Sequence, residues 1–234
     1  MSGAAAGAPA GGPAARGSFS PEDIRRGMLL YAVTDRAWLS DRPLADCVRE
    51  AIAGGATFVQ LREKGLATDE IVAEAAEIIP VCRAAGVPFV IDDDVEAARL
   101  SGADGVHVGQ SDVACAEARA ALGPEAIVGV SAQTVEEALA AQAAGADYLG
   151  VGAMYGTPTK PDAVDVTFEE LARICAAVDI PVTAIGGINA RTMGSLAGTG
   201  AAGAAVVSAI FAAEDIEAAT RELRRLAEDA VESR

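Results

Sequence analysis

The chain contains lysine at two positions, Lys64 in the segment QLREK and Lys160 in the segment TPTK, and it uses arginine at every other basic position. Each lysine stands beside other polar residues at the end of an apolar run. An ammonium group is a compact point charge on a flexible stem, whereas a guanidinium is a planar fork, so the two residues are not interchangeable. The two lysines are therefore candidates for a specific chemical role.

The segment TFVQLREK, residues 57–64, predicts a β-strand whose side chains alternate between two faces. Val59 and Leu61 then share one face, and Gln60, Arg62 and Lys64 share the other. In a barrel the apolar pair would pack beneath helices, and the polar set would point inward at the end where active sites lie. A half-buried strand with a solvated polar face is the alternative that the pattern leaves open.

Carboxylates end two further apolar runs, IDDD at residues 91–94 and GQSD at residues 109–112. Asp93 and Asp112 then come from neighbouring strand ends, which lie about 4.8 Å apart in a parallel sheet, close enough to share one cation. Oxygen ligands suit Mg²⁺, which binds through one or two carboxylates together with substrate phosphates. The alternative is that these aspartates cap the following helices, although three adjacent carboxylates repel one another without a cation.

The segment GAMYGTPTKPDAVDVT, residues 152–167, is the longest predicted connection. Long connections in compact domains tend to be functional. Thr157 and Lys160 each precede a proline, which favours an extended backbone. We interpret the segment as a lid that displays hydroxyl groups and an ammonium, with a polar surface excursion as the alternative.

Histidine and cysteine supply little recognisable chemistry. The sole histidine, His107, lies within the predicted strand GVHVGQ and is interpreted as a hydrogen-bonded core residue, and no Ser/His/Asp triad can be assembled. The four cysteines lie far apart in predicted helices and form no zinc-binding pattern. We expect buried thiols in a reducing cytoplasm at Cys47, Cys82, Cys115 and Cys175.

Eight apolar runs must position these residues, and each is followed by a segment with helical signals. The predicted strands are residues 28–35, 57–64, 88–94, 105–110, 126–133, 147–155, 182–188 and 204–210. The segments 67–86 and 134–146 have apolar residues three and four apart, which is typical of amphipathic helices. Gly86, Gly102 and Gly145 stand where a helix C-terminus needs a left-handed residue.

Alternating strands and helices indicate an α/β protein, either an open doubly wound sheet or a closed barrel. No GxGxxG motif follows the first strand, and the count of eight favours a single-domain (β/α)8 TIM barrel. The loops after the seventh and eighth strands of such barrels often bind phosphate. Gly186, Gly187 and Ser208 are small enough for this, although glycine pairs also serve tight turns, and Ser131 adds a hydroxyl to the same rim.

The composition excludes several classes of protein. At 234 residues the chain suits one domain, and 51% hydrophobic but only 4% aromatic residues indicate a core of Ala, Val, Leu and Ile. A net charge of -16 argues against nucleic acid or an anionic membrane as a partner. Residues 1–20 lack a signal-peptide pattern and are expected to be a disordered tail, with the barrel domain at residues 21–234.

The motifs QLREK, IDDD, HVGQSD, GVS, TPTK, GGI and VVSAI, in this order on successive strand ends, resemble thiamine-phosphate synthase over residues 28–212. QLREK, TPTK and the two spaced aspartates are specific as a set, whereas GGI and the final serine are not. The resemblance implies cytoplasmic thiamine biosynthesis from small phosphorylated substrates, with no nucleic-acid or membrane partner. It leaves open whether the chain forms a homo-oligomer.

Carried over by position, the resemblance implies that Gln60, Arg62 and Lys64 hold the diphosphate of 4-amino-2-methyl-5-hydroxymethylpyrimidine diphosphate. It implies that Asp93 and Asp112 hold Mg²⁺ against that diphosphate, and that Ser131 and Lys160 add donors. The implied ligands of the thiazole phosphate are Thr157, Thr159, Gly187, Val207 and Ser208. Both lysines then fall at a diphosphate, for which an ammonium is a suitable point-charge partner.

One residue departs from the family pattern. The position before the metal-binding aspartate, usually Asn and in contact with the pyrimidine, is Asp92 in this chain. A carboxylate accepts hydrogen bonds but donates none unless it is protonated.

The implied reaction is substitution: diphosphate departs, the resulting pyrimidine cation is stabilised by its ring amino group, and the thiazole nitrogen captures it. Where the thiazole bears a carboxylate, CO₂ is lost in the same overall reaction. Two alternatives remain. One is the thiazole tautomerase branch of the same barrel family, which does no diphosphate chemistry; the other is a non-catalytic barrel that binds a phosphorylated ligand.

Overall fold

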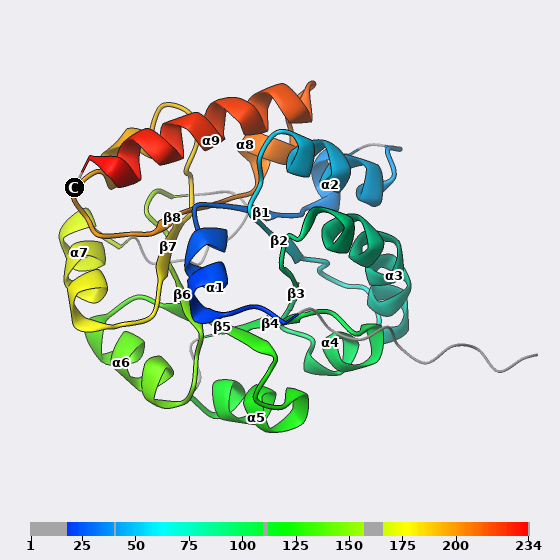
Figure 1. The fold of residues 1–234 in the computed structure, drawn as a ribbon, viewed down its shortest axis with the longest axis horizontal. Helices are drawn as coiled ribbons and strands as arrows, with labels where there is room; N and C mark the ends of the chain where they lie inside the picture. The colour runs from blue at the N-terminus through cyan, green and yellow to red at the C-terminus, as the bar shows by residue number, and fades with distance from the viewer. Residues whose placement is uncertain (1–17, 40, 110–111, 157–165, 234) are drawn as a thin grey trace, which may run out of the picture.

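The structure, a computed structural model, describes residues 18–39, 41–109, 112–156 and 166–233. It contains a closed barrel of parallel strands in the order β1-β2-β3-β4-β5-β6-β7-β8, surrounded by helices (Figure 1). The strands are β1 (Leu30–Val33), β2 (Phe58–Leu61), β3 (Phe89–Asp92), β4 (Gly105–Val108), β5 (Ile127–Ala132), β6 (Tyr148–Val151), β7 (Val182–Ile185) and β8 (Gly203–Val206). The predicted (β/α)8 barrel is confirmed.

Pairing between the first and last strands closes the sheet. Leu30 of β1 lies opposite Ala204 of β8, and Tyr31 of β1 lies opposite Phe58 of β2. Because strand side chains alternate between faces, Tyr31, Phe58 and Tyr148 fill the barrel interior while Val59 and Leu61 pack beneath the helices. Both sets are buried, which explains why the strands are nearly continuous apolar runs.

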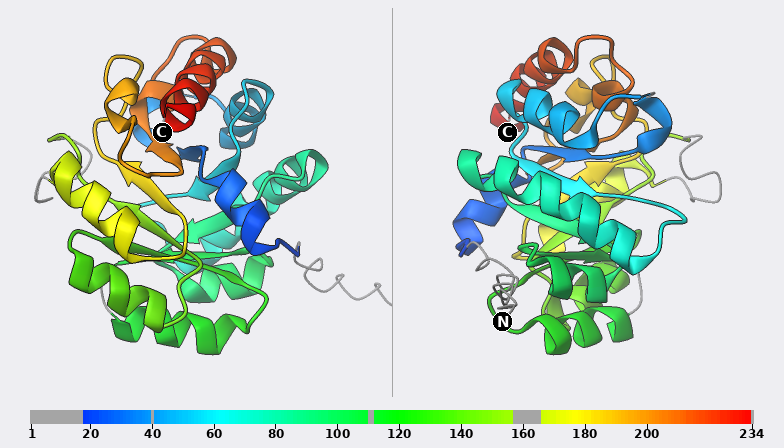
Figure 2. Two further views of the ribbon diagram at one scale, coloured as in Figure 1. Left: turned by 60° about the vertical axis from the view of Figure 1, so that its left-hand side comes forward. Right: turned by 90° about the vertical axis from the view of Figure 1, so that its right-hand side faces the viewer.

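The helices surround the barrel, except for the first, which lies across one end of it (Figure 2). The longer ones are α2 (Leu44–Ala53), α3 (Thr68–Ala85), α5 (Asp112–Leu122), α6 (Val135–Ala143), α7 (Phe168–Ala177) and α9 (Ile216–Glu232). The shorter ones are α1 (Pro21–Gly27), α4 (Val95–Ser101), α8 (Ser208–Phe211) and the 3-10 turns η1 (Arg36–Trp38) and η2 (Met193–Leu196). As predicted, Gly86 and Gly102 end helices in the left-handed conformation, and Gly145, the residue after the C-cap of α6, has φ 95°.

Helix α1 covers the end of the barrel at which the strands begin (Figures 1 and 2). Its Ile24 and the following Met28 are buried against the interior residues Tyr31 and Phe58. Gly27 permits this approach, since a Cβ there would lie 2.8 Å from a ring carbon of Phe58. The barrel is therefore closed by a helix at this end.

Several predicted boundaries of strands and helices are wrong. The strands are shorter than predicted: Met28 caps α1, and Lys64, Asp93 and residues 152–155 lie in loops beyond strand ends. The segment after β7 forms only η2, because glycines at positions 198 and 200 take left-handed φ angles of 76° and 84° that end regular helix.

The structured part also begins earlier than the predicted boundary at residue 21. Phe19 packs against the barrel interior, and Ser20 caps α1 by accepting a hydrogen bond from the Asp23 amide at 3.2 Å. Ser20 is the first half of a reciprocal capping box, in which its own N–H donates to the Asp23 carboxylate at 2.9 Å. Residues 1–17 of the predicted tail lie outside the described residues.

The predicted state of the cysteines is largely confirmed. All four lie on helices as thiols, and Cys47, Cys82 and Cys115 are buried. Cys175 is only partly buried, so the prediction of a buried thiol is too strong at that position.

Candidate active site

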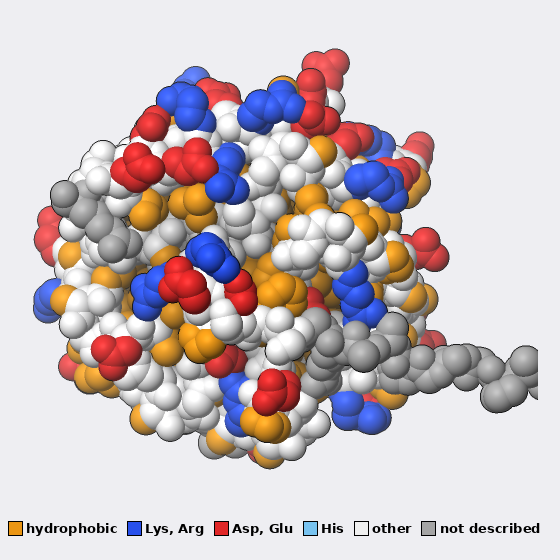
Figure 3. All heavy atoms as spheres, viewed as in Figure 1, with side chains coloured by type: hydrophobic (Ala, Val, Ile, Leu, Met, Phe, Trp, Pro, Cys, Tyr) orange, Lys and Arg blue, Asp and Glu red, His pale blue; other side chains and the backbone are white. Residues whose placement is uncertain are grey.

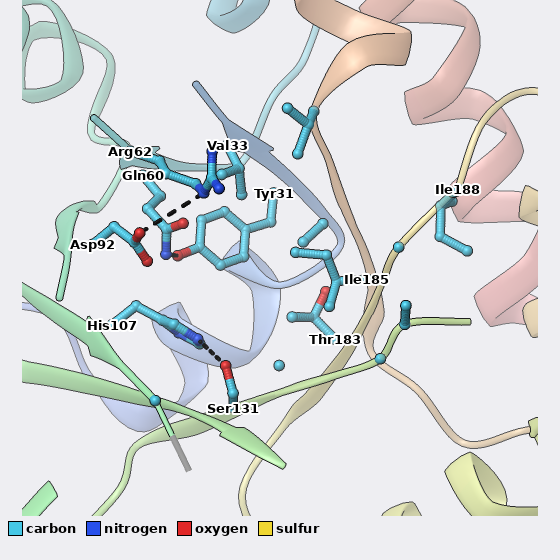
Figure 4. A pocket seen from close by; sticks show the side chains of 18 of the residues that line it. Tyr31, Val33, Gln60, Arg62, Asp92, His107, Ser131, Thr183, Ile185 and Ile188 are labelled. Carbon is cyan, nitrogen blue, oxygen red and sulfur yellow. Dashed lines mark hydrogen bonds and ion pairs between the residues drawn. The ribbon is translucent and has the colours of Figure 1, made fainter. Parts of the chain in front are cut away.

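A cavity of about 410 Å³ opens at the ends of the strands opposite α1 (Figure 4). Predicted site residues line it from β2, β3, β5 and the loops after β7 and β8. They are Gln60, Arg62, Lys64, Asp92, Asp93, Ser131, Gly187, Val207 and Ser208. The expected convergence of these residues at the C-terminal ends of the strands is thus confirmed. In Figure 4, Arg62, Gln60, Asp92, His107 and Ser131 lie on one side, and Ile185 and Ile188 lie on the other.

Lys64 lies between two adjacent carboxylates. Its Nζ is 2.9 Å from Asp92 Oδ2 and 2.7 Å from Asp93 Oδ2. Consecutive residues of an extended strand point to opposite faces, but Asp93 has a left-handed φ of 61° just after β3 ends. This turn of the backbone brings both side chains to the same ammonium.

Charge pairing keeps the Lys64 ammonium protonated. Partial burial lowers its pKa, but hydrogen bonds and charge from Asp92 and Asp93 outweigh that effect, so the pKa lies above its usual value. Just over half of the Lys64 side chain remains exposed, so the ammonium is held and yet accessible from the cavity. It presents a fixed positive charge at the mouth of the barrel.

Arg62 adds a second cation beside Lys64. Its guanidinium is 3.8 Å from Asp92 Oδ2 and 3.7 Å from Asp35 Oδ2, both longer than hydrogen-bond distances. The backbone N–H of Arg62 donates to Thr34 Oγ1 at 3.0 Å, which joins the end of β2 to the end of β1. The guanidinium therefore lies near its acidic neighbours without a strong bond to either, and it remains available to an anion.

Asp94 has a structural role, unlike the two aspartates before it. Its Oδ1 accepts the Ala97 N–H at 2.8 Å as the N-cap of α4, and its Oδ2 accepts the Thr68 hydroxyl at 2.8 Å. The capping alternative therefore holds for Asp94, whereas Asp92 and Asp93 face Lys64. The acidic run divides between helix capping and the site.

A chain of hydrogen bonds crosses the floor of the cavity. Gln60 Nε2 donates to the Tyr31 hydroxyl at 2.9 Å, and the Tyr31 and Tyr148 hydroxyls are 2.8 Å apart. Tyr148 is 3.1 Å from His107 Nδ1, and His107 Nε2 is 3.0 Å from Ser131 Oγ. The prediction that His107 is hydrogen-bonded is confirmed, but its ring also lines the cavity and is only partly buried.

Tyr31 and Tyr148 both keep their hydroxyl hydrogens. Burial is the largest cause that raises the pKa of Tyr31 well above its usual value, and the neighbouring Tyr148 and Asp92 add to the effect. Burial likewise raises the pKa of Tyr148, with a further contribution from the charges of Asp92 and Asp147. Neutral phenols are therefore expected at any physiological pH.

The glycine pair after β7 allows the backbone to approach another loop closely. Gly186 and Gly187 have φ angles of 98° and 66°, and a Cβ on Gly187 would lie 2.7 Å from the Cβ of Tyr155. The carbonyl of Gly187 accepts a hydrogen bond from the Asn189 side chain at 3.0 Å. These glycines serve a tight turn, as the alternative held, and they also line the cavity.

Comparison with known proteins identifies the family. A family model described as thiamine monophosphate synthase matches residues 30–210. The thiamine-phosphate synthase of Roseiflexus sp. (strain RS-1) is 44% identical over 209 residues, covering 89% of this chain and 89% of that protein. That of Ruminiclostridium cellulolyticum is 46% identical over 194 residues, covering 83% of this chain and 92% of that protein. The chain belongs to the thiamine-phosphate synthase family.

A solved member of the family has the same fold. The thiamine phosphate pyrophosphorylase from Pyrococcus furiosus superposes with a TM-score of 0.81 at 39% identity, over 88% of this chain and 98% of that one. A 3-hexulose-6-phosphate synthase structure matches with a TM-score of 0.58 at 23% identity, which shows the barrel fold alone. The sequence resemblance and the fold prediction are thus confirmed together.

Some residues expected from the resemblance to thiamine-phosphate synthases are not described by the structure. Thr157, Thr159 and Lys160, with most of the predicted lid, lie outside the described residues. Asp112 is the first residue of α5, which follows β4, but its side chain lies outside the described part. Their placement in the site stays a prediction.

Sequence reasoning missed several residues of the site. Tyr31, Thr183, Ile185 and Asn189, which line the cavity, were not singled out, and neither was Tyr148, which joins Tyr31 to His107. Strand alternation, applied to every strand, would have found Tyr31, Tyr148, Thr183 and Ile185, because each shares the inward parity of its strand. No local pattern marks Asn189, which lies beyond β7.

Proposed function

We propose that the chain joins 4-amino-2-methyl-5-hydroxymethylpyrimidine diphosphate to a thiazole phosphate, carboxylated or not, and releases diphosphate and thiamine phosphate. The observation that carries this proposal is the pairing of Lys64 with Asp92 and Asp93 beside Arg62 at the cavity mouth. A diphosphate needs cations, and a metal that binds it needs carboxylates. The described site presents both within one cavity.

The diphosphate would lie against Gln60, Arg62, Lys64 and Ser131, with Lys160 from the lid. Lys64 and Arg62 supply positive charge from alternate positions just beyond the end of β2, and Ser131 lines the same cavity from β5. Charges and donors placed before the reaction stabilise the negative charge that develops on the departing diphosphate. In this role Lys64, Arg62, Ser131 and Lys160 are catalytic residues.

The carboxylates fit a magnesium ion. Asp93 has 59% of its side chain exposed and offers oxygen ligands, which Mg²⁺ prefers. The described residues contain no group of three or more potential ligands, but Mg²⁺ needs only one or two carboxylates when a substrate phosphate completes the set. Asp93 and Asp112 would hold the ion. When bound, Mg²⁺ would neutralise charge on the diphosphate oxygens.

The thiazole phosphate would lie on the other side of the cavity. Gly187, Val207 and Ser208 line it there, and Thr157 and Thr159 belong to the predicted lid. Ile185 and Ile188 give this side an apolar wall that suits a heterocycle. Asp92 would face the pyrimidine and accept a hydrogen bond from its amino group.

The reaction would need little acid-base chemistry from the chain. The bond between the pyrimidine methylene carbon and the diphosphate oxygen breaks, and the electron pair leaves with the diphosphate towards Lys64 and Arg62. The cation left on the pyrimidine is stabilised by its ring amino group. The thiazole nitrogen then forms the new bond, so the main tasks of the protein are positioning and electrostatic stabilisation.

The alternatives account for less of the site. A thiazole tautomerase would not need the QLREK cations or the paired aspartates, and as a proton-transfer enzyme it should carry a histidine in the segment 152–167, where this sequence has none. A non-catalytic barrel that binds a phosphorylated ligand would leave the Lys64–Asp93 pairing unexplained. The synthase reaction uses all of these groups.

The proposed setting is the cytoplasm, where small phosphorylated substrates would be the partners of the enzyme. Among the described residues no helix is both long enough and apolar enough to cross a membrane. Self-association into a homo-oligomer remains compatible with this setting.

A turnover assay tests the proposal. The protein is incubated with both phosphorylated precursors and Mg²⁺, and thiamine phosphate and diphosphate are measured; chelation of the metal should abolish product and added Mg²⁺ should restore it. Lys64→Ala should lower kcat about 100-fold or more, as expected for loss of a preorganised electrostatic group.

Arg225→Ala is the matched control, since it removes a cation from a surface pair with Asp229 on α9, away from the cavity. Its turnover should equal that of the wild type. Folded wild-type protein that forms no thiamine phosphate would refute the synthase assignment.

A further inference from the structure

The hydrogen-bond chain on the cavity floor joins side chains from separate strands. Gln60 lies on β2, Tyr31 on β1, Tyr148 on β6, His107 on β4 and Ser131 on β5. The successive distances are 2.9, 2.8, 3.1 and 3.0 Å, all within hydrogen-bond range. Ser131 stands at the cavity end of this chain, so the direction of the hydrogens decides what Ser131 can offer to a ligand.

The direction is fixed at the Gln60 end. The Nε2 group of Gln60 can only donate, so the Tyr31 hydroxyl accepts its hydrogen bond. Tyr31 then directs its single hydrogen to its other partner, the Tyr148 oxygen. Tyr148 accepts that bond and directs its own hydrogen to His107 Nδ1.

The reverse direction is disfavoured by the burial of Tyr31. If His107 donated to Tyr148 and Tyr148 donated to Tyr31, then Tyr31 would accept two bonds and its own hydrogen would have no acceptor among the described residues. Tyr31 is 1% exposed, so water could not satisfy that hydrogen. An unsatisfied buried donor is costly.

We propose that Tyr31 and Tyr148 act as positioning residues that hold His107 as the neutral tautomer with its hydrogen on Nε2. His107 then donates to Ser131 Oγ, which leaves the Ser131 hydroxyl hydrogen available to an acceptor in the cavity. Ser131 thereby becomes a dedicated donor, which suits an acceptor such as a diphosphate oxygen. Assignment of that ligand rests on the proposed function; the tautomer does not.

Close packing fixes the relative positions of the side chains in this series of hydrogen bonds. A Cβ on Gly129 would lie 2.1 Å from Cζ and 2.3 Å from the hydroxyl oxygen of Tyr148, so only glycine leaves room for that hydroxyl. A Cβ on Gly150 would lie 3.1 Å from Cε1 of His107. The Tyr31 and Tyr148 rings meet edge to face with centroids 5.8 Å apart. The relative positions of the polar atoms are thus set by the interior of the barrel.

Nuclear magnetic resonance tests the tautomer directly. Because His107 is the only histidine of the chain, tag-free protein with isotope-labelled histidine gives one set of ring nitrogen signals and needs no assignment. The wild type should show a protonated Nε2 and an unprotonated Nδ1 at neutral pH. A protonated Nδ1, alone or together with Nε2, would overturn the proposal without any variant.

Two matched variants separate this role from general packing. Tyr148→Phe removes the donor to Nδ1 and should mix or reverse the tautomers. Tyr31→Phe removes the hydroxyl that donates to Tyr148, so Tyr148 can then donate to Nδ1 or accept from it, and the tautomers should mix to a smaller extent than in Tyr148→Phe. A tautomer that is unchanged in folded Tyr148→Phe would overturn the proposal.

A double-mutant cycle tests whether Tyr148 acts through Ser131. Binding of inorganic diphosphate with Mg²⁺ is measured by calorimetry, so the result does not depend on turnover. Tyr148→Phe should weaken binding about tenfold in the wild-type background and less than about twofold in the Ser131→Ala background.

An equal loss in both backgrounds would show that Tyr148 affects binding by another route. If the wild type shows the predicted tautomer and coupling but makes no thiamine phosphate, the proposed function fails and the positioning role stands.

Discussion

Asp93 depends on a backbone conformation that few residues tolerate. Its φ of 61° lies in the left-handed region, where non-glycine residues are uncommon and Asp and Asn are the best tolerated. Such conformations cluster at functional sites, where the surrounding structure holds them in place. In this chain the hydrogen bond from the Asp93 N–H to the His107 carbonyl at 2.8 Å helps to hold the conformation.

The adjacent residues Asp93 and Asp94 should give opposite mutational results. Asp93→Asn keeps a side chain that tolerates φ 61° but loses the charge, so kcat should fall about 100-fold while stability changes by less than about 0.5 kcal/mol. Asp94→Ala removes the α4 cap and should cost about 1 kcal/mol of stability with little change in kcat. Steady-state kinetics and denaturant unfolding measure both.

A folded Asp93→Asn enzyme with wild-type turnover would contradict the role of this carboxylate. Loss of folding in that variant would instead mean that the Asp93 charge is structural. Asp94→Ala controls for the effect of removing a carboxylate from this loop.

Asp92 competes with any anion for the two cations. It is 2.9 Å from Lys64 and 3.8 Å from Arg62, and only 13% of its side chain is exposed. Asp92→Asn, which restores the residue usual in the family, should therefore tighten the binding of inorganic diphosphate with Mg²⁺ by about tenfold, or 1.4 kcal/mol. Calorimetry measures the change, and weaker binding would show that Asp92 orients Lys64 and Arg62 instead.

At the scale of single residues, the sequence predicts which types of side chain line the site better than it predicts which side chains contact one another. Alternation within TFVQLREK placed Gln60, Arg62 and Lys64 on one face, and the structure confirms that they line one cavity. The contact between Tyr31 and Tyr148 joins residues 117 positions apart, and no local pattern indicates it. The left-handed turn at Asp93 was equally invisible, since adjacent residues in a strand are expected to diverge.

At the scale of elements, the number and order of strands followed from the sequence, but their ends did not. All eight predicted strands exist in the predicted order. The predicted runs included polar residues such as Lys64 that lie beyond the last ladder hydrogen bonds, because an apolar run does not show where pairing stops. The segment after β7 was predicted to be helical although its glycines, at positions 194, 198 and 200, argue against a regular helix.

Helix α1 should depend on the two residues before it. Deletion of residues 1–17 should leave the free energy of unfolding unchanged, whereas deletion of residues 1–20 removes Phe19 and the Ser20 cap and should cost about 1–3 kcal/mol. Denaturant unfolding of the two truncated proteins measures the difference. Equal stability would show that Phe19 and Ser20 contribute nothing to the closure of the barrel.

At the scale of the whole molecule, the net negative charge repels an anionic substrate at long range, and only nearby cations can attract it. The chain carries a net charge of -16, and acidic and basic side chains are interspersed on the face that α1 covers (Figure 3). An anionic substrate therefore meets a repulsive average field, and binding must come from Lys64 and Arg62 at the cavity mouth. A long polyanion would meet this repulsion over more of the surface, whereas a small phosphorylated molecule is expected to reach the site.

A single cavity should give sequential kinetics. Both substrates must lie in it together before the new bond forms, and the proposed reaction transfers no group to the protein. When both substrate concentrations are varied, double-reciprocal plots of the initial rate should intersect. Parallel lines, the signature of a covalent intermediate on the enzyme, would contradict the direct substitution.

Because helix α1 closes the end of the barrel at which the strands begin, substrates and products must enter and leave at the opposite end. The substrate that binds deeper in the cavity is expected to bind first. Its product is expected to leave only after the other product has left. Binding and release would then be ordered, and the order would be set by helix α1, which lies at the end of the barrel opposite the active site.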